Sequence, residues 1–378
     1  MVPIAAPELS REFGLPIALA GIHMAIIYLF GSICQLFAGG FIQKYGAARM
    51  SQVALISTAI GLMMGAIGEL WAYGLGAFII GAGSAVSTPA SSDILARFAP
   101  PKHAPLIFSI KQTAVPVGGI LVGTLVPFLI TGWGWQAMFL TLGSSCLVLG
   151  ILFQCVRRRF DSNRNPSHVI YVSQGYHTIM AVLAPPKFRE LVFATFTFCG
   201  LQGVFGAFFV AYLVEVMGMS LAEAGAIFAI AQAASIVFRI TWGWFAGLWG
   251  PRPVLATLGV SMAFIAILCG FISADWPHWI ITGIAVAYSA TAISWHGVVL
   301  AEVSRLSKIG QTATNTGGLL SFANAGQTTY PALFSVLLAA GGGFSLGFIL
   351  AGPPAFLAGV ALLVRGFKPN NNANNKSK

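Results

Sequence analysis

The chain has 378 residues, of which 57% are hydrophobic and only 8% are charged, and its mean hydropathy is +0.83. A soluble domain carries about 25% charged residues, so this composition excludes a soluble protein and predicts a chain that lives in a lipid bilayer. The net charge of +10 does not indicate a nucleic-acid partner, because the basic residues gather in alternate loops.

Long apolar runs follow one another along the chain, separated by charged or Pro/Gly-rich breaks. A membrane-spanning helix needs about 20 apolar residues, so each run predicts one crossing. In chain order the eleven predicted spans cover residues 19–42, 51–68, 71–96, 105–130, 136–155, 191–214, 221–248, 252–272, 277–303, 311–338 and 344–365. The sequence therefore predicts an all-α polytopic membrane protein with no room for a soluble catalytic domain.

One long polar stretch, residues 156–190, separates the fifth predicted span from the sixth. It divides the chain into an N-terminal helical bundle at 1–155 and a C-terminal helical bundle at 191–366. A polar tail follows at 367–378. We expect two helical bundles joined by a central loop.

The basic residues orient the chain in the membrane. Apart from Arg11, Lys111 and Arg239, the Lys and Arg residues lie on the same side as the central loop. That side is cytoplasmic by the positive-inside rule. The pattern predicts a multi-pass protein of the bacterial inner (plasma) membrane, with a cytoplasmic C-terminus.

Two glycine-rich turns repeat one another about half a chain apart. The first reads Gly40-Phe-Ile-Gln-Lys-Tyr-Gly46-Ala-Ala-Arg49, and the second reads Gly243-Trp-Phe-Ala-Gly-Leu-Trp-Gly250-Pro-Arg252. Both carry two glycines and then a base at a tight cytoplasmic turn. A repeat of this length in a polytopic membrane protein favours two related bundles with a binding site between them.

With these turns, the Pro-Gly-Gly element at 115–119 and the Gly-Trp-Gly-Trp-Gln turn at 132–136, the chain resembles the major facilitator superfamily of secondary transporters. The runs at 109–112 and 300–305 are most similar to its bacterial cyanate-permease-like and monocarboxylate-transporter-like members. The resemblance implies two pseudo-symmetric bundles that rock around a central site, and it assigns gating to the glycines and bases of the two turns. Gln43 and Gly247 stand where the family usually has an acid.

The same resemblance makes the first predicted span the second helix of the family. The chain is then expected to lack family helix 1 and to keep only its last turn, at residues 1–6. A start further upstream would supply that helix. A chain that functions with eleven spans is the alternative.

Two bases lie inside predicted spans, where a charged group costs about 2.5 kcal/mol or more. Lys111 has three interpretations: it attracts an anion, pairs with Asp93 on the preceding span, or extends to the interface. Arg239 keeps its proton and needs a carboxylate, several carbonyls or an anionic ligand. In monocarboxylate transporters a helix 8 Arg four residues before a Gly belongs to the substrate site, which favours Arg239 over a structural pair with Glu302.

No Asp or Glu lies near the middle of any predicted span. Two deep bases without a deep acid give a positive potential, which favours an anionic substrate. His296 is either a hydrogen-bonded core residue or a proton carrier. The expected substrate-binding residues are Arg239, Lys111, Gln112, Trp295, His296, Tyr288, Gln202 and Asn324.

The sequence therefore predicts a secondary active transporter of a small anion, such as an organic carboxylate, that works by alternating access. One alternative is efflux of hydrophobic compounds through a pocket of Phe205, Phe208, Phe209 and Trp295. Another is a membrane receptor or scaffold that does not transport. Catalytic and phosphate-binding motifs are absent from the sequence, and we expect no enzyme activity, cofactor or metal. The expected partners are the lipid bilayer and a small solute, and the expected state is a monomer.

Overall fold

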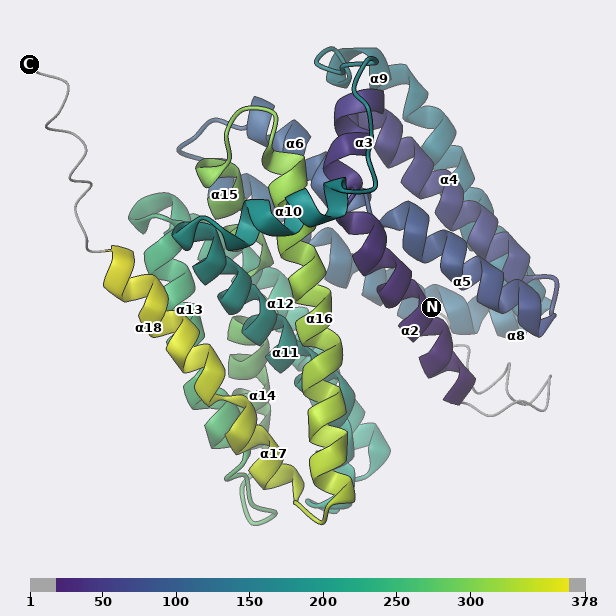
Figure 1. Ribbon diagram of the computed structural model, residues 1–378. Coiled ribbons are helices and arrows are strands. Elements are labelled where there is room, and N and C mark those ends of the chain that lie inside the picture. The colour runs from purple at the N-terminus through teal and green to yellow at the C-terminus, as the bar shows by residue number, and fades with distance from the viewer. Residues whose placement is uncertain (1–17, 367–378) are drawn as a thin grey trace, which may run out of the picture. The chain divides into compact units, whose positions relative to one another are not determined.

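The computed structural model describes residues 18–366, and all regular secondary structure in this range is helical (Figure 1). The expected remnant of family helix 1 and the polar tail at 367–378 lie outside the described residues. The first part of the chain forms α2 (Ala18–Gln35), α3 (Ala38–Tyr45), α4 (Ala47–Gly65), α5 (Leu70–Ser84), α6 (Ser87–Phe98), α7 (Ala104–Gln112) and α8 (Ala114–Leu152). The central loop holds α9 (Gln154–Phe160) and α10 (Gln174–Leu183). The remainder forms α11 (Pro186–Glu215), α12 (Leu221–Trp249), α13 (Pro251–Cys269), α14 (His278–Ala292), α15 (His296–Leu306), α16 (Thr312–Ala339), α17 (Phe344–Ala351) and α18 (Pro353–Gly366).

Within the described residues, eight helical stretches are long and apolar enough to cross a membrane, or nine if α2 and α3, bent by 62°, form one span. The stretch Ala104–Leu152 counts once, although Gly134, with φ 83°, breaks it between two predicted spans. The helix α16 is not among the eight because its first half is rich in Thr, Asn and Ser. The membrane character of the chain is confirmed, and the number of eleven spans stays a prediction.

The chain divides into two compact units, which we describe separately. Unit 1 holds the described residues up to Ala99 together with Ala114–Pro185 and Val303–Asn324. Unit 2 holds Pro100–Thr113, Pro186–Glu302 and the described residues from Ala325 onward. Each unit includes one short segment from the other half of the sequence, so α7 belongs to unit 2. The predicted bundles at 1–155 and 191–366 stay a prediction.

Unit 1 is built around α4, which packs against α5 and α8, while α2 packs against α5 (Figure 1). Small residues allow the close approach of α4 and α5: a methyl group at Gly61 would lie 2.6 Å from the carbonyl oxygen of Gly76. Val126, Met138 and Phe139 form an apolar cluster on α8, against which Leu62 of α4 and Tyr73 of α5 pack. Packing of this kind holds helices together where no hydrophobic effect acts between them.

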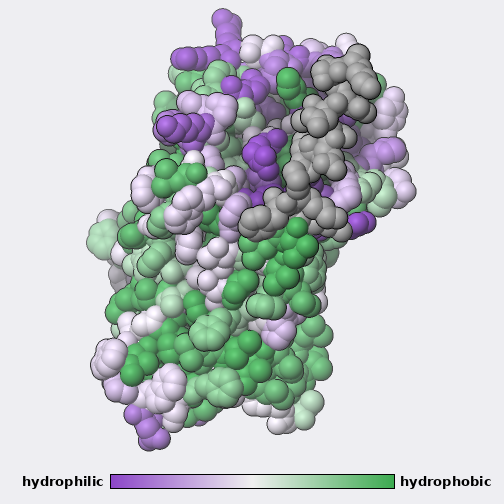
Figure 2. All heavy atoms as spheres, turned by 90° about the vertical axis from the view of Figure 1, so that its left-hand side faces the viewer, coloured by the Kyte–Doolittle hydropathy of each residue, from purple (hydrophilic) through white to green (hydrophobic). Residues whose placement is uncertain are grey.

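Unit 2 is built around α13, which lies beside α18 (Figure 1). Gly259 of α13 and Gly359 of α18 face one another, since a methyl group at Gly259 would lie 2.9 Å from the Cα of Gly359. Figure 2 shows the side of the molecule that carries these two helices as a broad hydrophobic surface with hydrophilic residues at its two ends. Phe264 of α13 and Leu357 of α18 are exposed. An exposed apolar surface of this extent fits contact with lipid.

Candidate functional site

An interrupted helix lies at the centre of the candidate site in unit 2. The helices α14 and α15 belong to one candidate span, His278–Leu306, but the helix is broken at residues 293–295. Ser294 stabilises the break: its hydroxyl donates to the carbonyl of Ser289 on α14 at 3.1 Å, or to that of Ser235 on α12 at 3.3 Å. Irregular backbone inside a membrane span is tolerated where protein groups satisfy it or where it lines a site.

Arg239 lies on the face of α12 that contacts this break. Ser235, one turn before it, contacts Ser294, and Trp242, almost one turn after it, donates its indole N–H to the carbonyl of Ala290 at 2.7 Å. The Arg239 side chain is 2% exposed. Its Nη1 donates to the main-chain carbonyl of Gln112 at 2.7 Å, and its Nε has no hydrogen-bond partner among the described residues.

Two glycines allow α7 to approach this region closely. A methyl group at Gly243 of α12, or at Gly297 of α15, would overlap Ser109 of α7. Ser109 is completely buried, and its hydroxyl has no hydrogen-bond partner among residues 18–366. The absence of a Cβ at Gly243 and Gly297 therefore brings α7, α12 and α15 together, and this approach places the Gln112 carbonyl on Arg239.

Lys111 and His296 complete the cluster. Lys111 Nζ donates to the side-chain oxygen Oε1 of Gln112 at 3.0 Å. The His296 ring stacks on Trp295 with 3.9 Å between ring centroids, and its Nδ1–H donates to the carbonyl of Ile293 at 3.3 Å. Arg239 and Lys111 both act electrostatically on His296. The cluster therefore joins two cations and one titratable ring at the broken helix.

Five of the residues expected from the sequence are thus brought together: Arg239, Lys111, Gln112, Trp295 and His296. The other three have different surroundings. Tyr288 is packed against Phe205 and donates its hydroxyl to the carbonyl of Leu201 at 3.0 Å, and the side-chain oxygen Oε1 of Gln202 is buried without a partner among the described residues. Asn324 belongs to unit 1, where its side-chain amide donates to Gln35 at 3.2 Å.

One of the two ion pairs that the sequence left open, that of Arg239 with Glu302, is not found: Arg239 takes part in no ion pair of the described residues. Asp93 pairs with Arg97, one turn further along α6, at 3.1 Å. Its pairing with Lys111 was inferred from their similar depth in neighbouring spans, and it stays a prediction because the two residues belong to different units.

The two glycine-rich turns share one backbone feature. Gly46 lies between α3 and α4 with φ 98°, and Gly250 lies between α12 and α13 with φ 88°. Only glycine adopts such angles without strain. Gly243 differs, because it lies inside α12 and contacts α7. A gating role for these glycines stays a prediction.

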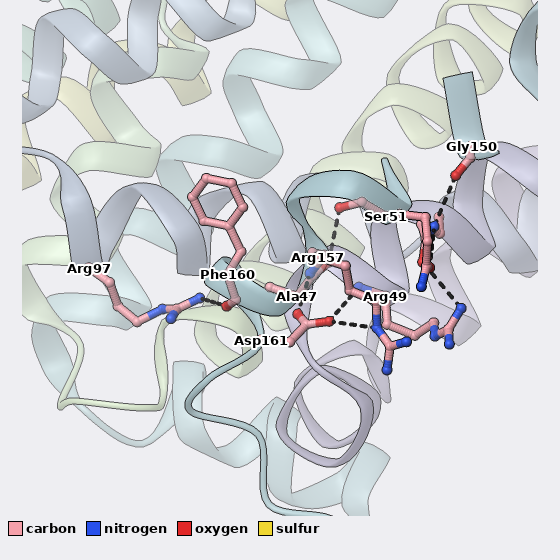
Figure 3. A network of polar contacts seen from close by, with 11 residues as sticks. Ala47, Arg49, Ser51, Arg97, Gly150, Arg157, Phe160 and Asp161 are labelled. Carbon is pink, nitrogen blue, oxygen red and sulfur yellow. Dashed lines mark hydrogen bonds and ion pairs between the residues drawn. The ribbon is translucent and has the colours of Figure 1, made fainter. Parts of the chain in front are cut away.

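At each turn, an acidic residue from the central loop, residues 156–190, contacts the start of the following helix. Figure 3 shows the Asp161 carboxylate at the start of α4, where it accepts the backbone N–H groups of Ala48 at 2.7 Å and Arg49 at 3.1 Å. In unit 2, Arg252 in the first turn of α13 forms a buried ion pair with Glu190. These acids were not expected from the sequence, since both lie outside the two turn motifs.

The aromatic residues proposed for a hydrophobic pocket are packed against other side chains. Phe205, Phe209 and Trp295 are completely buried. Phe205 stacks on Phe209 and on Tyr288, with 4.6 Å between ring centroids in each pair. A different apolar cavity of unit 2, of about 340 Å³, is lined by Tyr330, Leu333, Phe334, Leu350 and other residues.

Residues 18–366 hold no group of three or more His, Cys, Asp or Glu side chains that could bind a metal ion. The described cysteines are free.

Sequence reasoning did not identify Ser109, Ser294 or Gly297 as parts of the site. The Ser294-Trp-His-Gly297 run was a usable signal, because Ser and Gly beside an apolar stretch weaken a helix at that point. The approach of Ser109 to Gly297 could not be foreseen, since it joins residues far apart in the sequence.

These helices and the buried cations within them are features of a membrane transporter. The family model described as Major Facilitator Superfamily matches residues 1–305 and 191–378, and the chain belongs to this superfamily. Its all-helical fold is therefore that of the superfamily, as the sequence motifs predicted.

Similar proteins include several bacterial transporters. A match to the uncharacterized transporter YybO of Bacillus subtilis has 27% identity and covers 52% of this chain, and the chain spans only 46% of that relative. The gentisate transporter of Corynebacterium glutamicum is 23% identical over 94% of this chain and 81% of its own length. The hexuronate transporter of Bacillus subtilis is 21% identical over 95% of this chain and 88% of its own length.

Among solved structures, the human organic anion transporter MFSD10 (TETRAN) has a TM-score of 0.76 at 16% identity. The similarity covers 95% of this chain and 89% of that one. At this identity the similarity shows the fold alone.

Proposed function

We propose that this protein is a secondary transporter of a small organic anion and that Arg239 is the main contact for its negative charge. The observation that carries the proposal is the state of Arg239, a nearly completely buried guanidinium with one carbonyl partner and no carboxylate among the described residues. A buried cation is costly unless it is paired. A transported carboxylate would supply the missing charge, and the guanidinium fork can bind it through two hydrogen bonds.

Lys111 is the second charge contact in this proposal. Its ammonium is engaged by a neutral amide oxygen and not by an acid. His296, which stacks on Trp295 at the break, is the residue proposed to take up a proton when transport is coupled to a proton gradient. Rocking of two bundles around a midplane site, a cytoplasmic C-terminus, a bacterial inner membrane and a monomeric state belong to the same proposal.

The relatives support an anionic substrate. Those named for gentisate and for hexuronate carry names of organic acids that are ionised at neutral pH. Their low identity leaves the substrate of this chain open, and gentisate and glucuronate are therefore suitable first probes.

The test is uptake of labelled gentisate and glucuronate into proteoliposomes that contain the purified protein. Arg239→Gln should lower uptake by about 30-fold or more, because removing one partner of a buried charged contact costs about 2 kcal/mol or more. Arg189→Gln is the matched control, since Arg189 is exposed on α11. Equal uptake by the Arg239→Gln variant and the wild-type protein would remove Arg239 from the site.

Efflux of a hydrophobic compound is the second candidate function, and the apolar cavity of unit 2 is the observation that favours it. Competition by small organic anions distinguishes the two functions. Gentisate and glucuronate should inhibit an anion transporter and should leave efflux of a neutral dye unchanged. A protein that binds gentisate without carrying it into sealed vesicles would be a receptor.

A further inference from the structure

The break between α14 and α15 places a helix N-terminus inside a membrane span. The first N–H groups of a helix have no acceptor within the helix. The backbone N–H groups of His296, Gly297 and Val298 form no hydrogen bond with the carbonyls of the break at residues 293–295, and the regular pattern resumes when Val299 donates to the carbonyl of Trp295 at 3.1 Å. Such a terminus carries partial positive charge and favours an anion.

Two buried side chains with unused donors lie at the same place. Ser109 contacts Gly297 in the first turn of α15, and its hydroxyl has no hydrogen-bond partner within residues 18–366. Arg239, on the α12 face that contacts the break, has an Nε–H without a partner among the described residues. The unused donors of Ser109 and Arg239 are independent of the helix terminus, and both side chains are more than nine-tenths buried.

The region therefore has an excess of donors over acceptors. Its acceptors, the carbonyls of Gln112 and Ile293, are already engaged by Arg239 and His296. A ligand that matches the remaining donors must accept hydrogen bonds and carry negative charge. Because unpaired buried donors cost about 1–3 kcal/mol each, the ligand would gain from satisfying several at once.

We propose that the start of α15, the Ser109 hydroxyl and the Arg239 Nε–H together bind the carboxylate of the transported anion. The inference rests on the proposed function and names its substrate class, a carboxylate. It adds Ser109 and the α15 backbone as contacts. The glycines Gly243 and Gly297 bring α7, α12 and α15 into close contact beside these donors, and the limited space favours the two oxygens of a carboxylate over the four of sulfate.

Ser109→Ala is the first test, because it removes one oxygen and keeps the packing against Gly297. The KM for gentisate uptake in proteoliposomes should rise about tenfold, the effect of losing one hydrogen bond to a charged group. Ser91→Ala is the matched control: Ser91 lies on α6 in unit 1, where its hydroxyl donates to the carbonyl of Ser87 in its own helix. Inorganic sulfate in excess should not compete with gentisate.

His296→Pro, compared with His296→Ala, tests the backbone contact. Proline is well accommodated at the first position of a helix, where it removes only a free N–H. The Pro variant should therefore bind gentisate about fivefold more weakly than the Ala variant, although both lack the imidazole. Equilibrium binding in detergent gives both affinities without requiring flux.

The outcomes separate this inference from the proposed function. Loss of uptake in Arg239→Gln with an unchanged KM in Ser109→Ala would overturn the carboxylate site at α15 and leave the transporter proposal intact. Competition by sulfate as strong as that by unlabelled gentisate would overturn the assignment to a carboxylate. No uptake or binding of gentisate or glucuronate by the wild-type protein would overturn both. If His296→Pro fails to fold, Ser109→Ala alone decides.

Discussion

Arg97 in unit 1 and Arg239 in unit 2 each donate a hydrogen bond to one main-chain carbonyl, but they differ in whether a carboxylate is also nearby. Arg97 donates through Nη2 to the carbonyl of Phe160 at 2.8 Å, and Arg239 donates through Nη1 to the carbonyl of Gln112 at 2.7 Å. Arg97 also has the Asp93 carboxylate at 3.1 Å, whereas Arg239 has no carboxylate among the described residues. The charge of Arg97 is therefore balanced by an acid of the protein, and the charge of Arg239 is not balanced by any described acid.

Other charged residues near Arg97 are also paired within unit 1. Figure 3 shows Arg97, Arg157 and Asp161 in one network with the start of α4. Asp161 accepts two backbone N–H groups there and pairs with Arg157 at 3.3 Å. A helix N-terminus in unit 1 is thus bound by an acid of the protein, while no carboxylate of the described residues binds the start of α15 in unit 2. A buried charge that lacks a partner is costly, and it favours a ligand that supplies one.

The largest effect is expected from a variant that adds a carboxylate to the cluster of Arg239 and Lys111 in unit 2. Gln112→Glu keeps the shape of the side chain and places a carboxylate on Lys111, whose Nζ lies 3.0 Å from Oε1 of Gln112 in the wild-type protein. The new ion pair should lower gentisate uptake by at least about tenfold, because an internal anion competes with the transported one. The thermal midpoint of the purified variant should not fall.

The control for this change is Gln154→Glu, which places the same isosteric acid in unit 1, where the exposed Gln154 side chain accepts a hydrogen bond from Gln52 at 3.1 Å. Uptake by that variant should stay within twofold of wild type, as it lies outside the cluster. Equal losses of uptake in both variants would mean that any added acid damages the protein.

Much of the fold could be predicted from the sequence, because membrane helices are long apolar runs and their ends are marked by charges, glycine and proline. The predicted span at 221–248 agrees closely with α12, Leu221–Trp249. The predicted spans at 71–96 and 277–303 each correspond to one candidate span, but the break that divides each into two helices was not predicted. Hydropathy averages over about 20 residues and does not detect a break of two or three.

The site could be predicted only in part. Arg239 and Lys111 were identifiable from their charge inside apolar runs, since such groups need a reason to be there. Ser109 and Gly297 were not, because their importance comes from contact between helices distant in the sequence. The acids were the least predictable, as Asp161 and Glu190 act on turns about 110 and 60 residues away, a relation that only the packed helices define.

The next prediction removes the acid from unit 1. Asp161→Asn should lower the free energy of unfolding by about 1–3 kcal/mol, because the α4 N-terminus and Arg157 lose a charged acceptor in a buried place. Denaturation in mixed micelles measures this change. The affinity for gentisate should be unaffected, which is the reverse of the result expected for Ser109→Ala. A weaker affinity with unchanged stability would place Asp161 in the binding site.

The smallest expected effect is that of breaking the ion pair between Asp93 and Arg97. A double-mutant cycle with Asp93→Asn and Arg97→Gln should give a coupling energy of about 0.5–1 kcal/mol, because the pair is one turn apart on α6 and Arg97 is a quarter exposed. The same cycle applied to Glu302→Gln and Arg239→Gln should give a coupling near zero, since Arg239 forms no ion pair with Glu302 in the described residues. A coupling of 2 kcal/mol or more between them would show a counter-charge for Arg239 inside the protein, and the argument for an anionic ligand would then lose its basis.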